Sequence, residues 1–177
     1  YGVKIRARST VTDFVTISGC IDSQLENVQI DGNNFATNTF RCKNQLENFI
    51  GRQWRIGGCV NGGVNMNMSG VTTNTDIAQM SFYDVDLQGC GSRATGSGIT
   101  NLMINSDQSL VLCFYRLNAF GNTAGAVAVS INIDIVKGTA TFYTPFSTLI
   151  TTNDFRMGEG TLTIVDGRSE STTADSI

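Results

Sequence analysis

The sequence predicts an all-β protein, a single-stranded right-handed parallel β-helix that winds as a solenoid of about five to six coils. Three observations predict this fold. A motif of apolar, polar, apolar, variable, then glycine followed by cysteine or asparagine begins at Val28, Trp54, Val85 and Leu117, with steps of 26, 31 and 32 residues. A second strand-like segment follows the later copies. Nineteen glycines against one proline indicate many tight turns.

Short runs of alternating apolar and polar residues predict the strands in chain order. Residues 3–7 and 14–17 come first, and residues 25–30 then lead into a turn at Asp31-Gly32-Asn33-Asn34, where glycine and asparagine tolerate a positive φ. The companion strands that follow the motif copies are residues 63–68, 98–104 and 125–131, and further runs occupy residues 139–143 and 162–167. No helix longer than about two turns is expected.

Composition narrows the classes of function. The net charge is −3, and the 12 basic residues are scattered, so the electrostatic footprint of a nucleic-acid binder is missing. No apolar run approaches the roughly 20 residues that span a bilayer, so we expect no membrane partner. The chain has no histidine, which excludes a Ser-His-Asp triad, a Cys-His dyad and most zinc sites. We expect neither a metal nor another cofactor.

Domain organisation is predicted to be simple. Nothing in residues 1–177 resembles a linker or a change of composition, so we expect a single domain. The pattern of strands stops partway through a coil, which predicts that this domain is part of a longer chain.

The motif assigns faces to its residues. Val28, Trp54, Val85 and Leu117 should form one inward column, with a second inward column two residues later, by the alternation of side chains along a strand. The residues between these columns, and the residues one place before the motif, should point outward. They are polar in every copy: Gln29, Arg55, Asp86 and Asn118 in one column, and Asn27, Gln53, Asp84 and Arg116 in the other.

These features resemble the pectate-lyase-like right-handed parallel β-helices, and within them the bodies of bacteriophage tailspikes. The resemblance is carried by residues 25–34, by the Gly-Cys-Val-Asn-Gly-Gly turn at 58–63 and by residues 168–171, and it covers roughly residues 14–170. It implies a homotrimeric spike on a virion tail that binds bacterial surface polysaccharide and cleaves it if catalytic residues are present. Because related β-helices include lyases, hydrolases and non-catalytic virion parts, whether this chain is an enzyme stays open.

Asp84 and Asp86 are the candidate catalytic residues. Residues two apart on a strand share a face, with Cα atoms about 6.5–7 Å apart. Glycoside hydrolysis uses two carboxyl groups about 5–5.5 Å apart for retention or about 6.5–9.5 Å apart for inversion. The competing and favoured interpretation is structural, because Arg55 and Arg116 fall one strand away in the same columns and would form ion pairs with the two aspartates.

Three residues are candidates for substrate binding. Arg55 and Arg116 could neutralise an acidic sugar, which would suit a secreted polysaccharide lyase, although hydrolysis is favoured over elimination. Trp54 could provide a stacking platform for a sugar, but the register points it inward and favours a place in the core. The remaining alternative is a non-catalytic structural or adhesion module of a virion or cell surface, whose outward polar columns only confer solubility.

Overall fold

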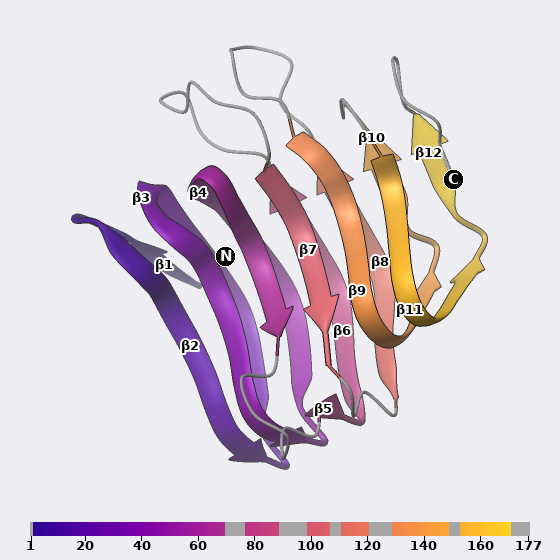
Figure 1. Cartoon of the computed structure of the whole chain (residues 1–177). Helices are drawn as coiled ribbons and strands as arrows, with labels where there is room; N and C mark the ends of the chain where they lie inside the picture. The colour runs from indigo at the N-terminus through magenta and orange to yellow at the C-terminus, as the bar shows by residue number, and fades with distance from the viewer. Residues whose placement is uncertain are drawn as a thin grey trace.

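The computed structural model describes residues 2–69, 77–88, 99–106, 111–120, 129–148 and 153–170. These residues form twelve β-strands and no helix, and all their strand pairings are parallel (Figure 1). The strands are β1 (Val3–Arg6), β2 (Val11–Ile21), β3 (Gln24–Glu47), β4 (Ile50–Ser69), β5 (Ile77–Ala78), β6 (Met80–Gln88), β7 (Ile99–Asn105), β8 (Leu112–Phe120), β9 (Val129–Tyr143), β10 (Phe146–Thr148), β11 (Asn153–Val165) and β12 (Arg168–Glu170). Within the described ranges, no helix has the length and hydropathy needed to cross a bilayer.

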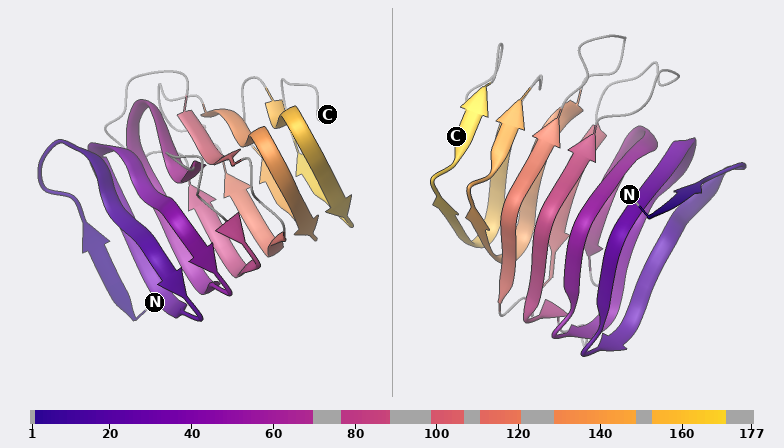
Figure 2. Two further views of the ribbon diagram at one scale, coloured as in Figure 1. Left: turned by 60° about the horizontal axis from the view of Figure 1, so that its bottom comes forward. Right: turned by 180° about the vertical axis from the view of Figure 1, so that it is seen from behind.

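The register of the motif copies is the one that the sequence predicts. Val28 of β3 pairs with Trp54 of β4, Trp54 pairs with Val85 of β6, and Val85 pairs with Leu117 of β8. The column two residues later also aligns: Ile30, Ile56, Leu87 and Ala119. Both columns are buried, so the two predicted inward columns are confirmed. In Figure 2 the main strands follow chain order from the indigo to the yellow side of the molecule.

The predicted open right-handed β-helix is wrong. The sequence pattern predicts that the motif glycines form turns that end each strand, but β3 and β4 run through Gly32, Gly57 and Gly58 as strands of 24 and 20 residues. As a result β4 pairs with both β6 and β7. β6 pairs in turn with β8, β7 pairs with β9, and β8 pairs with β9. The strand pairings therefore return on themselves, and the fold is a closed barrel of 7 parallel strands with 5 extra strands instead of an open solenoid.

The strands bend at residues with a left-handed backbone. Asn27, Gln53, Asp84 and Arg116, each one place before a motif copy, have φ values of 56°, 55°, 55° and 57°. Such a φ is uncommon for residues other than glycine and marks a departure from the extended strand. The simple alternation used to place these four residues therefore does not hold, and each one lies at a bend between two extended segments.

Aromatic rings fill the interior beside the motif columns. Phe82, Phe114 and Phe142 stack with ring centroids 5.0 Å apart at each step. Trp54 is fully buried, contacts Phe82 edge to face at 5.4 Å, and donates its indole hydrogen bond to the backbone oxygen of Leu25 at 2.9 Å. The predicted place of Trp54 in the core is confirmed, and a buried indole with its polar hydrogen satisfied has no group left for a surface ligand.

A column of buried asparagines links three strands. The Asn65 side-chain amide donates to Asn101 at 2.7 Å, and Asn101 donates to Asn132 at 2.6 Å. Asn65 and Asn101 also donate to the backbone oxygens of Gln88 and Phe120, at 2.8 and 3.0 Å. The column thus ties β4, β7 and β9 to the ends of β6 and β8, which makes it a structural feature and not a binding site.

Substituting Gly51 with alanine should destabilise the protein. A Cβ atom at this position would lie 2.6 Å from a ring carbon of Phe82 and 2.9 Å from a ring carbon of Trp54. Because both rings are held by packing, we expect the free energy of unfolding to fall by about 1–3 kcal/mol, measured by denaturant titration. Gly2→Ala is the matched control, since its Cβ would meet Asn27 at an ordinary 3.6 Å.

Replacing Asn101, the central asparagine of the column, should lower the free energy of unfolding more than replacing a surface polar group does. Asn101→Ala leaves the Asn65 amide, the Phe120 carbonyl and the Asn132 side-chain oxygen each with one hydrogen bond fewer in a buried place. We expect a loss of about 1–3 kcal/mol for each group left unpaired, read from the same titration. Thr163→Ala on the exposed surface of β11 should leave the unfolding curve nearly unchanged, and equal effects of the two variants would contradict a structural role for the column.

Candidate functional site

The candidate site is the outward polar surface of β3, β4, β6 and β8. Its central column is in register from strand to strand and consists of Gln29, Arg55, Asp86 and Asn118. The neighbouring column lies at the left-handed bends and consists of Asn27, Gln53, Asp84 and Arg116. Both predicted outward columns therefore exist, and the parallel register holds the members of the central column roughly 4.8 Å apart from one strand to the next.

Two shallow hollows open on this surface. The larger has a volume of about 320 Å³ and is lined by Asn27, Gln53, Asp84 and Asp86. Its walls are two amides and two carboxylates, so the structure brings the two predicted carboxylates to one hollow even though Asp84 lies at a bend.

The smaller hollow has a volume of about 140 Å³ and opens where Gly57 and Gly58 carry no side chain. Gln29, Asp31, Arg55 and Gln88 supply its polar lining. Arg55 of this hollow and Asp86 of the larger hollow form an ion pair, so the two hollows adjoin along the central column.

Asp84 is held in a two-point ion pair. Arg116 donates from Nη2 to Asp84 Oδ2 at 2.7 Å and from Nε to Oδ1. These hydrogen bonds, more than the charge of Arg116 alone, lower the pKa of Asp84 and raise the pKa of Arg116. A carboxyl group in this setting is ionised at neutral pH and is a poor general acid, because a general acid needs a raised pKa.

Asp86 has partners on both sides in its column. Asn118 donates its side-chain amide to Asp86 Oδ1 at 2.8 Å, and Arg55 Nη2 lies 3.5 Å from Oδ2. The predicted ion pairs of Arg55 with Asp86 and of Arg116 with Asp84 are therefore both confirmed. A catalytic role for the two aspartates stays a prediction, and Trp54 is buried away from both hollows.

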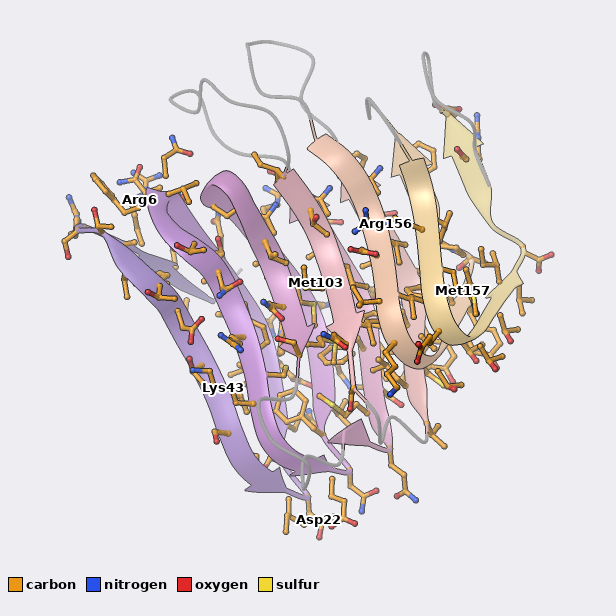
Figure 3. All side chains as sticks on the ribbon, in the orientation of Figure 1. Arg6, Asp22, Lys43, Met103, Arg156 and Met157 are labelled. Atoms are coloured by element: carbon orange, nitrogen blue, oxygen red, sulfur yellow. The ribbon has the colours of Figure 1, made fainter. Side chains whose placement is uncertain are left out.

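Two prominent surface features lie outside the sequence motif. Tyr83, Tyr115 and Tyr143 stack in register on the outside, and the first two stand two residues before Val85 and Leu117, so extending the motif backward would have found them. On the other side of the molecule, Asp134 is 1% exposed and forms a two-point pair with Arg156 at 2.9 and 2.6 Å. Figure 3 labels Arg156 on β11 among the strands nearest the viewer, whereas β6 and β8 lie behind them.

Among the residues that the structure describes, no group of three or more histidine, cysteine, aspartate or glutamate side chains is placed to hold a metal ion. Comparison with known proteins returns no matching family model, curated protein or solved structure. The resemblance to pectate-lyase-like proteins and tailspikes therefore depends on the sequence motifs alone.

The stabilisation that the ion pair of Asp84 and Arg116 contributes should fall at acidic pH. Because the folded-state pKa of Asp84 is lowered, its contribution to stability is present above the unfolded aspartate value of about 3.9 and is lost as the pH falls through the folded-state pKa. The contribution is small, since the Asp84 side chain is 40% exposed and solvent screens the pair. In Arg116→Ala the Asp84 pKa should rise toward its usual value, as measured by NMR titration of the carboxyl carbon. An unchanged Asp84 pKa would contradict the pairing.

Proposed function

We propose that the protein is a binding module for bacterial surface polysaccharide and that the outward surface of β3, β4, β6 and β8 holds the glycan. The observation that carries this proposal is the larger hollow, whose lining consists of side-chain amides and carboxylates from three successive strands. Amides donate and accept hydrogen bonds, and carboxylates accept them, which is the combination that sugar hydroxyl groups need.

The carboxylates of Asp84 and Asp86 are held in position by neighbouring side chains before any ligand binds. Arg116 and Asn118 hold Asp84 and Asp86, and the register of a parallel sheet fixes the spacing of the backbone beneath them. Groups that are preorganised lose little conformational freedom when a ligand binds, which favours recognition of a flexible, hydroxyl-rich chain. Asp84 and Asp86 are balanced in charge by Arg116 and Arg55, which suits an uncharged stretch of glycan.

The same contacts favour binding over cleavage. Hydrolysis by a carboxyl pair needs one protonated member, and the pKa of Asp84 is lowered by Arg116. Asp86 accepts hydrogen bonds that hold it in its column. The choice of bacterial polysaccharide as the ligand class, with a virion tail as the corresponding location, comes from the sequence motifs that resemble tailspikes and not from the fold, which is a closed barrel.

The proposal predicts measurable binding that depends on the amides of the larger hollow. An array of purified bacterial capsular and lipopolysaccharide glycans would identify a ligand, and calorimetry would then give its affinity. Asn27→Ala and Gln53→Ala should each weaken binding by roughly 5- to 10-fold, which is about 1–1.4 kcal/mol for one lost hydrogen bond. Thr161→Ala on exposed β11 is the control for a polar side chain outside the hollows.

Product analysis separates the alternatives. We expect no new reducing ends when the bound glycan is incubated with the protein. Release of reducing ends that Asp84→Asn abolishes would instead identify a hydrolase, and products that absorb ultraviolet light through a new double bond would identify a lyase. A complete absence of glycan binding would favour the structural or adhesion module.

A further inference from the structure

The outward tyrosine stack is a chemically distinct feature of the surface. Tyr83 of β6 pairs in register with Tyr115 of β8, and Tyr115 pairs with Tyr143 of β9. The ring centroids of Tyr83 and Tyr115 are 4.6 Å apart with an interplanar angle of 6°, and those of Tyr115 and Tyr143 are 4.8 Å apart with an angle of 4°. The three phenols are therefore nearly parallel and face one another.

The ends of the stack are closed by other residues. The guanidinium carbon of Arg52 lies 4.3 Å from the centroid of Tyr83, and Val165 of β11 is the strand partner of Tyr143. Tyr115 thus has a phenol on each side, whereas Tyr83 and Tyr143 have one each. All three side chains are half-buried, so their faces are covered by each other while the stack remains in contact with solvent.

We propose that this stack is a site of oxidative cross-linking, at which a one-electron oxidant such as a haem peroxidase with hydrogen peroxide joins Tyr115 to Tyr83 or Tyr143 as dityrosine. Each phenol loses one electron and one proton to give a phenoxyl radical. The two radicals combine through the ring carbons beside the hydroxyl groups, and the hydrogens on those carbons move to the oxygens as the rings regain aromaticity. Overall two hydrogen atoms leave the protein, and one hydrogen peroxide is reduced to two water molecules.

The geometry favours coupling within one chain. The parallel register presents the same ring carbons of neighbouring tyrosines toward each other, and the strand pairing keeps the two radicals adjacent for as long as the fold lasts. Partial burial first, and then the neighbouring Cys113 thiol, raise the pKa of Tyr115, so this phenol is neutral at physiological pH and its oxidation releases a proton with the electron. The product would join strands that are 32 or 28 residues apart in the sequence.

The test is oxidation of the chain at low concentration with a haem peroxidase and limiting hydrogen peroxide. We expect a monomer that has lost two hydrogen atoms by intact mass spectrometry, dityrosine fluorescence, and a linked peptide pair containing Tyr115. The cross-linked monomer should also unfold at a higher denaturant concentration, because a covalent link restricts the unfolded chain. Tyr1→Phe is used as the background, since it removes the fourth tyrosine of the chain.

Matched variants locate the reaction. Tyr115→Phe keeps an aromatic ring in the stack but leaves Tyr83 and Tyr143 two strands apart, roughly 9–10 Å, and should abolish the intramolecular product. Tyr83→Phe should retain the link between Tyr115 and Tyr143, and Tyr143→Phe should retain the link between Tyr83 and Tyr115. Circular dichroism of each variant confirms that the fold is kept.

A further variant tests how the thiol of Cys113 affects the yield of dityrosine. Cys113 can return an electron and a proton to a tyrosyl radical, so Cys113→Ala should increase the yield of dityrosine. The proposal is overturned if Tyr115→Phe forms as much intramolecular product as the parent chain. It is equally overturned if both the parent chain and Cys113→Ala form only intermolecular dityrosine, or none.

Discussion

Parallel hydrogen bonding in register is the interaction on which this protein depends. It places each residue directly beside its counterpart on the next strand, so a side chain must suit its neighbours in the column as well as its own surroundings. Phenylalanine stacks on phenylalanine at 82, 114 and 142, and asparagine bonds to asparagine at 65, 101 and 132. The core thus consists of columns whose members share one chemical type.

The same register also determines which surface side chains lie next to each other, and there neighbours in a column must differ in charge. Identical apolar side chains gain by stacking, but identical charges in one column would repel. The structure instead alternates charge, with Arg55 beside Asp86 and Asp84 beside Arg116. Carboxylates used in this way are held ionised and fixed in position, which suits recognition of hydroxyl groups better than it suits proton transfer.

Much of the candidate site could be predicted from spacing alone. The motif at Val85 aligned with those at Val28, Trp54 and Leu117, and that alignment placed both ion pairs and the buried tryptophan correctly. The position of Asp84 does not follow from the spacing of the motif. Its φ of 55° depends on a bend in the strand, and alternation along an ideal strand has no means of representing such a bend. The tyrosine stack was within reach of the same alignment but lay just outside the motif.

The sequence by itself determined the all-β character, the register of the four motif strands and the chemical type of their columns, because these follow from local alternation and from the regular spacing of the motif. Only the tertiary structure decided how the strand pairings close. Gly32, Gly57 and Gly58 are compatible with either a turn or a continuing strand, and the pairing of β8 with β9 joins a motif strand to a strand that the motif does not include. The hollows beside Asp86 are likewise set by the side chains of several strands together.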